Sequence, residues 1–318
     1  MNYLRFVLIL LTLSAGMSSR SQGVQKGPYT VHEISENVYR IEDANETNPP
    51  GGVVGDEGQL VSMNNCSDMY LIIGGNKGLL IDLSNDVKWD PTARESLHSL
   101  VHEIAGDKEL CITVTHRHGD HLGMLPAFLE DPKARFWIPG NEFSGMDIFP
   151  EARTTYFQEY GFLDLGGEYL VNTLEVPGHT AHSTVFILAG RDLVFTGDAI
   201  GSGSGVWLFN EASFYTYRGS IESLIAYMED DANQVDTDEL RIFGGHFWQG
   251  EEPDGLRAQY IYDMRTLMGE MEKGSVKPED MSTFISFLDA NFTYGTATIT
   301  WNKEAAAKFA ASSKDEQK

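Results

Sequence analysis

Cysteine is scarce in this sequence, which removes one common way of holding a fold together. The 318 residues include two cysteines, Cys66 and Cys111, so no disulfide framework can organise the chain. Cys111 lies in LCITVTH, a segment typical of a buried strand, where a free thiol packs as a small apolar side chain. We expect both thiols to be unpaired, with a disulfide between them as the alternative in an oxidising compartment.

Positive charge is also in short supply. The chain has 23 lysines and arginines against 47 aspartates and glutamates, which gives a net charge of -24 and a pI near 4.6. Such a surface repels phosphate backbones, so we expect a small-molecule substrate and no nucleic-acid partner. The composition, 42% hydrophobic and 22% charged, is that of a globular protein with a sizeable core.

No hydrophobic run is long enough for a comfortable membrane span, which needs about 20 apolar residues. The N-terminal run from Phe6 to Leu13 follows Arg5 and precedes small and polar residues. This pattern is typical of a signal peptide. We therefore expect residues 1–22 to be a signal peptide and the protein to be secreted or periplasmic, with an uncleaved membrane anchor as the alternative.

Apolar patterning along the rest of the chain predicts strands alternating with helices. Each half offers a hairpin, a helix, and a strand that runs into a histidine-bearing loop, which favours layered α/β packing. Residues 45–65, rich in Gly, Pro and Asn, should form a loop. We expect one domain over 23–318, with a frayed tail from about 303. The expected strands are 29–34, 37–43, 68–75, 79–83, 109–115, 183–190, 191–198, 240–246 and 296–300, with short strands in 162–176, and the expected helices are 90–105, 122–131, 220–228 and 255–272.

Three histidines and an aspartate crowd the segment THRHGDHLG, residues 115–123. Side chains at i and i+2 of an extended loop point the same way, so His116 and His118 can bind one ion together. Asp120 and His121 lie at the start of the expected helix and point elsewhere, which suits a second ion. Taken alone, Asp120 would also fit a helix N-cap. Imidazole and carboxylate ligands favour zinc and also tolerate iron or manganese.

Two ions need more ligands than this loop supplies. Further candidates are His179 in VPGHTAHS, Asp198 in VFTGDAI and His246 in FGGHFW. Each follows an apolar strand, where a ligand can be held on a rigid edge. The sequence therefore predicts two divalent metal ions bound by side chains from distant segments.

The motifs THRHGDH, GHT, TGD and GGH, in this order, resemble the metal motifs of the metallo-β-lactamase superfamily. Asp82, which ends LLID, matches the first motif of that family, and the agreement runs from about Val31 to His246. The resemblance implies a four-layer αβ/βα sandwich of the metallo-β-lactamase type, with the site between two β-sheets. It also implies that Asp82 steadies the histidine loop without binding metal. By the same resemblance, one metal is bound by His116, His118 and His179, the other by Asp120, His121 and His246, and Asp198 bridges the two.

Weaker features surround these motifs. His182 occupies a place where the family usually has a small residue; it is a candidate for the substrate pocket, although a structural role is the simpler interpretation. His98 and His102 have the i, i+4 spacing of a helical metal-binding pair. We expect no third ligand nearby and therefore ordinary surface histidines. An aromatic run after the flexible segment 201–205 fits either a wall of the substrate pocket or the core, and it comprises Trp207, Phe209, Phe214, Tyr215 and Tyr217.

Two metal ions at such a site would make the protein a hydrolase. Two divalent ions about 3.5–4 Å apart can share a water and lower its pKa towards 7. The bridging hydroxide, oriented by Asp120, would attack an activated acyl bond: a lactam, a lactone or a thioester. No cysteine stands at a ligand motif, which excludes the lactamase subclass with a cysteine ligand. His121 makes the sequence similar to three-histidine lactamases, glyoxalase II-type thioesterases and acyl-homoserine lactonases.

Other functions stay open at this point. The expected export disfavours glyoxalase II, whose glutathione thioester is cytosolic. An iron-dependent oxidoreductase of the same fold, a phosphodiesterase and a metal-binding protein without catalysis are the alternatives. Fold and metal ligands alone do not select among substrates.

Overall fold

The computed structural model describes residues 23–43, 53–54, 60–62, 67–87, 90–201, 205–247, 254–281, 283 and 285–316. The expected signal peptide and Cys66 lie outside these ranges. Cys111 is a buried free thiol. No helix within the described ranges is long and apolar enough to cross a membrane.

The first sheet contains the N-terminal strands and carries two helices on its outer face. Its strands run in the order β1-β2-β3-β6-β7-β8-β9-β10. From β7 to β10 the neighbouring strands are parallel, so their carboxyl ends meet at one edge. The elements are β1 (Val24–Lys26), β2 (Tyr29–Ser35), β3 (Val38–Asp43), β6 (Met69–Ile73), β7 (Lys77–Ile81), α1 (Ala93–Ala105), β8 (Glu109–Thr113), α2 (Pro126–Leu129), β9 (Ala134–Pro139) and β10 (Thr154–Phe157).

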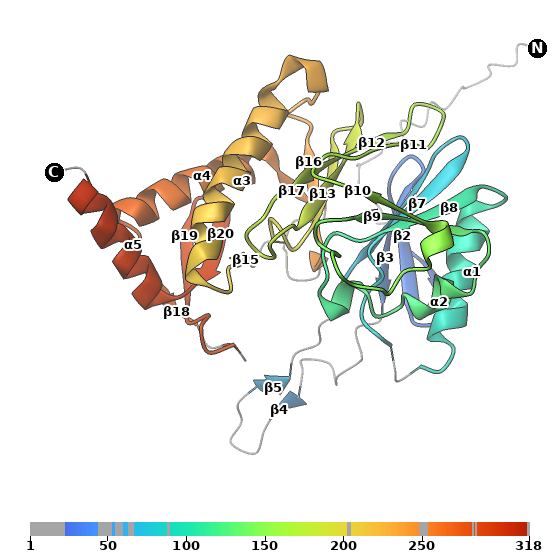
Figure 1. Cartoon of the computed structure of the whole chain (residues 1–318), viewed down its shortest axis with the longest axis horizontal. Coiled ribbons are helices and arrows are strands. Elements are labelled where there is room, and N and C mark those ends of the chain that lie inside the picture. The colour runs from blue at the N-terminus through green and yellow to red at the C-terminus, as the bar shows by residue number, and fades with distance from the viewer. Residues whose placement is uncertain are drawn as a thin grey trace, which may run out of the picture.

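The second sheet repeats this arrangement with the C-terminal half. Its order is β11-β12-β13-β14-β16-β17, and β14 and β16 are parallel neighbours. Two long helices cover its outer face (Figure 1). The elements are β11 (Phe162–Asp164), β12 (Leu170–Glu175), β13 (Thr184–Ala189), β14 (Leu193–Gly197), α3 (Glu211–Glu229), β16 (Arg241–Gly244), β17 (Leu256–Arg257) and α4 (Ala258–Lys273).

Alternation along the strands explains the four layers. On β7, Leu80 packs with the apolar faces of α1 and α2, whereas Leu79 packs in the core between the two sheets. On β13, Phe186 faces that same inter-sheet core, whereas Val185 and Ile187 face α3 and α4. Successive strand residues point to opposite faces, so strands that are buried on both faces are apolar throughout. The fold is the expected four-layer αβ/βα sandwich.

A smaller sheet of four strands, in the order β15-β20-β19-β18, packs with α3 and α4 at the other end of the molecule from α1 (Figure 1). It consists of β15 (Val206–Trp207), β18 (Glu279–Asp280), β19 (Ala290–Tyr294) and β20 (Ala297–Trp301). Strand β15 pairs in parallel with β20, and the N–H of Leu208 donates to the carbonyl oxygen of Thr300 over 3.1 Å. This pairing fixes the segment that follows the metal-ligand candidate Asp198.

The expectation of a frayed tail from about 303 is wrong, because residues Lys303–Glu316 form helix α5. The side chain of Asn302 caps this helix by accepting the N–H of Ala305 over 3.0 Å. Its alanines are strong helix formers, and Phe309 is buried against the ring of Phe214, with ring centroids 4.7 Å apart. Capping and one aromatic anchor therefore order the tail.

Other elements also differ from expectation. Strands β9 and β10 were not expected, since ARFWIP and TTYF show no clear alternation. The helix expected over 122–131 is shorter, because Pro126 stands at its start and a 3-10 turn (Gly119–His121) precedes it. Within the expected loop 45–65, β4 (Val53–Val54) pairs with β5 (Leu60–Ser62).

Candidate metal centre

The metal-ligand candidates lie where strands of the two large sheets end. His116 and His118 follow β8 of the first sheet, and His179 follows β12 of the second. Asp198 comes directly after β14, and His246 comes two residues after β16. Because β14 and β16 are parallel, their carboxyl ends place Asp198 and His246 side by side. Strand ends thus bring together residues that are up to 130 positions apart.

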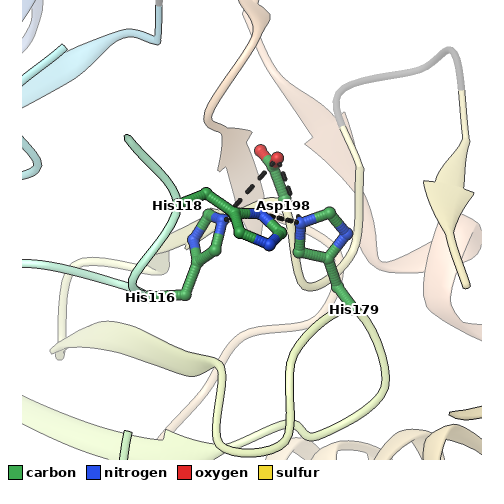
Figure 2. A group of neighbouring side chains, drawn as sticks. All are labelled: His116, His118, His179 and Asp198. Carbon is green, nitrogen blue, oxygen red and sulfur yellow. Dashed lines mark hydrogen bonds and ion pairs between the residues drawn. The ribbon is translucent and has the colours of Figure 1, made fainter. Parts of the chain in front are cut away.

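One cluster joins His116, His118, His179 and Asp198. One ligand atom from each lies within 4.8 Å of the others. Nδ1 of His118 lies 3.0 Å from Nε2 of both His116 and His179. Oδ2 of Asp198 lies 3.4 Å from Nε2 of His179 and 3.9 Å from Nε2 of His116. Figure 2 shows the three rings converging on this carboxylate.

A second cluster joins Asp120, His121 and His246 to the same aspartate. Nε2 of His246 lies 3.4 Å from Oδ2 of Asp120 and 3.3 Å from Oδ2 of Asp198. Nε2 of His121 and Oδ1 of Asp198 are 3.4 Å apart, and both are buried without a hydrogen bond. Buried polar atoms that lack hydrogen bonds are costly, and a cation between these two would satisfy both. The two clusters share Asp198 and are compatible with a dinuclear metal site.

The three histidines of the first cluster are held neutral. Burial lowers the pKa of His116 well below its usual value and lowers the pKa of His118 as well. Burial also lowers the pKa of His179 to about 4, although the charge of Asp198 opposes it. Nδ1 of His179 lies 3.0 Å from the carbonyl oxygen of Trp207, which leaves Nε2 facing the cluster. Neutral imidazole is the form that binds metal.

The second cluster has the opposite electrostatics. Burial alone would lower the pKa of His246, but the charge of Asp198 and hydrogen bonds with Asp120 and Asp198 raise it to about 10. The pKa of His121 is raised well above its usual value despite burial, because Asp198 and Asp82 are close. Burial would raise the pKa of Asp198, yet the charges of His246 and His121 keep it well below its usual range. The carboxylates therefore require positive charge here, which protons or divalent cations can supply.

Asp82 binds the histidine loop at three points. Its carboxylate accepts the N–H of Thr115 over 2.7 Å and the hydroxyl of Thr115 over 2.9 Å. It also lies 2.9 Å from Nδ1 of His121, which turns Nε2 of that ring towards Asp198. Asp82 adopts a left-handed backbone conformation with φ of 62°. These contacts support the orienting role expected for it.

Gly245, the second glycine of the GGH motif, is required because His121 and Asp198 approach it closely. A Cβ atom on Gly245 would lie 2.6 Å from Cε1 of His121 and 2.7 Å from Oδ1 of Asp198. Distances below 3.0 Å are too short for a carbon atom, so any side chain here would displace a ligand.

Glu142 is a contributor that the sequence did not reveal. It follows β9, and its carboxylate is buried. One oxygen accepts the N–H of Arg117, between the first two histidines, over 3.1 Å, and the other accepts the N–H of His182 over 3.1 Å. Glu142 therefore connects the histidine loop to the loop that carries His179. A single acidic residue in NEF gives no signal of this role, because both partners are distant in sequence.

A second unexpected contributor is the segment Ser67–Asp68. The hydroxyl of Ser67 donates to the carbonyl oxygen of Asp120 over 2.7 Å. The N–H of Asp68 donates to the carbonyl oxygen of Gly245 over 2.6 Å, and its carboxylate accepts the N–H of Phe247 over 2.7 Å. This segment holds the backbone on both sides of the second cluster.

The aromatic run divides between the site and the core. The ring of Phe209 lies 5.0 Å from that of His179 and 5.7 Å from that of His118, so it covers the first cluster. Trp207 contacts Phe209, with ring centroids 6.4 Å apart. Tyr217, a candidate for either the pocket wall or the core, is fully buried on α3 and packs on the glycine before His179, where a Cβ would lie 2.5 Å from its ring. Tyr217 supports the loop from behind, so of the two expected roles, pocket wall or core, it has the core role.

Two further candidates have contacts of their own. Tyr215 is exposed on α3 and packs edge-on against Phe309 of α5, so it belongs to the contact between these helices. Nδ1 of His182 lies 3.1 Å from Oε2 of Glu175, and its ring is partly exposed. Neither residue belongs to the two ligand clusters.

The expectation that His98 and His102 have no third ligand nearby is wrong. Asp131, which follows α2, lies beside both rings, and the three residues form a separate cluster. The 3-10 turn that contains Asp120 has His118 at its cap position, so Asp120 does not cap it.

Comparison with known proteins agrees with the site. The model of the metallo-beta-lactamase superfamily matches residues 67–235, more than half of the chain. A hydroxyacylglutathione hydrolase of Rhodopseudomonas palustris is 28% identical over 52% of this chain and 67% of its own length. An atrochrysone carboxyl ACP thioesterase of Claviceps purpurea is 29% identical over 42% of this chain and 40% of its own length.

Solved structures show the same fold at low identity. A metallo-beta-lactamase from Pontibacter korlensis matches with a TM-score of 0.52 at 16% identity, over 76% of this chain and 99% of that one. Together with the family match and the shared fold, the two ligand clusters lead to one assignment. The chain belongs to the metallo-beta-lactamase superfamily, as one of its metallo-hydrolases.

Proposed function

We propose that the protein is a secreted hydrolase that uses two divalent metal ions, with zinc the best fit, to cleave an activated acyl bond. The observation that carries this proposal is the pair of ligand clusters that share Asp198. Five imidazoles and two carboxylates are more than one ion needs; the seven ligands are His116, His118, Asp120, His121, His179, Asp198 and His246.

Bound ions would lower the pKa of a shared water and polarise a substrate carbonyl. The remaining work is done by the chain. Asp120, next to His246 at the edge of the second cluster, is placed to accept a hydrogen bond from the attacking water and orient it. Asp82 and Glu142 hold the ligand loops in position, and Phe209 shields the first cluster from solvent.

Lactams, lactones and thioesters are the candidate substrates. The two curated relatives described above act on thioesters by name, which favours that class for the first tests. The net charge of -24 disfavours a polyanionic nucleic acid, which argues against a phosphodiesterase acting on such chains. The ring of Phe209 beside His118 and His179 favours substrates with an apolar group next to the scissile bond.

Metal analysis combined with a substrate panel tests the proposal. Purified mature protein should contain at least two equivalents of zinc and should hydrolyse at least one chromogenic lactam, lactone or thioester. His32→Gln is a suitable control, because His32 pairs with Glu42 on the first sheet and lies outside the clusters. A firm content of one ion with no gain on adding zinc would exclude the dinuclear site. Iron with redox activity and no hydrolysis would favour the oxidoreductase.

We also propose export through the N-terminal segment, on the basis of Arg5 and the short apolar run that follows it. Mass spectrometry of the exported protein should show a new N-terminus between about Ser18 and Gly23. An intact Met1 on a membrane-bound form would indicate an anchor.

A further inference from the structure

A third cluster of metal-ligating side chains lies on the outer helical layer. His98 and His102 are one turn apart on α1, with ring centroids 4.5 Å apart. Asp131 reaches them from the turn between α2 and β9. Its Oδ2 lies 2.6 Å from Nε2 of His102 and 3.4 Å from Nε2 of His98. The same nitrogen of each ring thus faces the same carboxylate oxygen.

The carboxylate is fixed in this orientation by its surroundings. Oδ1 of Asp131 accepts the N–H of Lys133 over 2.9 Å, which leaves Oδ2 directed at the histidines. The guanidinium of Arg153 donates to the main-chain carbonyl oxygens of Asp131 and Leu129. Asp131 has a side-chain exposure of 6%, whereas His102 and His98 have 21% and 39%. One side of the cluster is therefore rigid and buried, and the other is open to solvent.

These distances suit a zinc ion. Zinc binds histidine nitrogen at about 2.0–2.1 Å and carboxylate oxygen at about 2.0–2.2 Å in a tetrahedral arrangement, so its ligand atoms lie roughly 3.3 Å apart. The separation of 3.4 Å between His98 and Asp131 already matches, and the closer contact with His102 needs to open by roughly 0.7 Å. Two imidazoles, one carboxylate and a solvent-facing position form a common zinc ligand set.

A hydrogen-bonded cluster without metal is the competing explanation, because one carboxylate oxygen can accept from two protonated rings. That arrangement satisfies the carboxylate oxygen without an ion. It therefore predicts that the zinc content of the protein does not depend on these residues. We propose that His98, His102 and Asp131 bind one zinc ion, with water completing the coordination, and that this ion fastens α1 to the turn after α2.

The site is distinct from the dinuclear centre in ligands and in position. Its three residues come from α1 and from the turn before β9, and none of them belongs to the two clusters that share Asp198. The chain connects the two regions through α2, which begins five residues after His121 and ends two residues before Asp131.

Zinc content of matched variants tests this inference. Full-length mature protein, His98→Gln, His102→Gln and His32→Gln are dialysed against a rising series of buffered free zinc concentrations and analysed for bound zinc. Wild type and His32→Gln should bind one equivalent more than His98→Gln or His102→Gln. His32 is a matched control, since it also pairs with a carboxylate, that of Glu42, and has a comparable exposure of 29%. Circular dichroism should show that all four chains are folded.

The outcomes are decisive for this site alone. The measured quantity is a difference between chains, so it does not depend on whether the dinuclear centre holds one ion or two. Equal zinc content in wild type and in both variants at every free zinc concentration would overturn the inference. A loss in His32→Gln as large as in His98→Gln would also overturn it, because the extra ion would then not be bound at these residues.

Discussion

Histidines and carboxylates form clusters at two places in this protein: at the strand ends that carry Asp198, and on helix α1 beside Asp131. The side chains at these two places are held differently. At the proposed dinuclear centre, His116 and His121 are fully buried after the end of β8, and Asp82 fixes the loop that carries them. On α1, His98 and His102 stand partly in solvent, and Asp131 alone is fixed. The first arrangement is set before any ion binds, whereas the second leaves two rings free to adjust.

This difference indicates different roles. A buried, oriented ligand set holds reacting groups to within a fraction of an ångström, which catalysis requires. A partly exposed set with one rigid member can bind an ion without placing it as accurately, which is sufficient to join two elements of the fold. Substitutions at the two places should therefore affect different measurements.

The largest effect is expected for Asp120→Ala. This change removes a metal ligand and the group that orients the attacking water, while the sheets stay intact because the loop lies at their edge. We expect a loss of about 3 kcal/mol or more in transition-state stabilisation, which is about a hundredfold or more in turnover. The measurement is steady-state hydrolysis of a substrate from the panel, with metal content determined for each sample.

Asp107→Ala serves as the control for this variant, because Asp107 is exposed in the turn after α1. It should retain the turnover of the wild type. Near-normal turnover of Asp120→Ala at full metal occupancy would show that the hydrolytic mechanism is wrong as written.

A smaller effect is expected for Asp82→Asn. Asparagine tolerates the left-handed backbone at this position, so the change removes charge from the contacts with Thr115 and His121 and leaves the backbone in place. Loss of such an orienting group commonly costs about 10–100-fold in metal affinity or activity. Competition with a chelator measures the affinity.

The hairpin residue Asp192 provides a matched control. It also has a left-handed conformation, with φ of 53°, but its carboxylate accepts the N–H of Asp236 far from the ligand loops. Asp192→Asn should leave metal affinity unchanged. Equal affinities of wild type and Asp82→Asn would remove Asp82 from the support of the site.

A still smaller and different effect is expected for Glu142→Gln. Glutamine keeps the volume but turns an amide NH2 towards one of the two N–H groups, that of Arg117 or of His182. A buried donor left without an acceptor costs about 1–3 kcal/mol. Urea unfolding should show this loss in the free energy of unfolding, and the exposed Glu222→Gln on α3 should show none. An unchanged free energy of unfolding for Glu142→Gln would mean that the connection between the two ligand loops carries no stability.

Much of the arrangement of the two ligand clusters that share Asp198 could be predicted from the sequence, because their residues follow strands in a fixed order. His116 to His121 form a dense local pattern, and Asp198 and His246 each end an apolar strand. The layers could be predicted for the same reason, since buried strands such as β7 and β13 are continuous apolar runs.

The parts that were not predicted depend on contacts between distant residues. Glu142 and Asp131 each meet partners more than 20 positions away, and nothing in their own neighbourhoods signals this. The role of Tyr217, pocket wall or core, stayed open because α3 was expected to begin at residue 220, although Asn210 caps it at its true start by accepting the N–H of Ser213. Asn210 was the local signal that could have placed the start of the helix before Tyr217 and so assigned this side chain to the core.

The smallest effect, and the sharpest comparison between the two places, concerns thermal unfolding of His98→Gln. An ion that binds only the folded chain raises the free energy of unfolding, and the gain grows with the logarithm of the free ion concentration divided by the dissociation constant. Zinc should therefore raise the unfolding temperature of wild type further than that of the variant. We expect a difference of a few degrees with zinc. In excess chelator both chains lose all ions, and an exposed substitution changes stability by no more than about 0.5 kcal/mol, so their unfolding temperatures should coincide. His32→Gln should follow wild type in both conditions. If His98→Gln gains as much from zinc as wild type does, the cluster on α1 joins its helices by hydrogen bonds alone, and the dinuclear centre is the only one of the two places that uses metal.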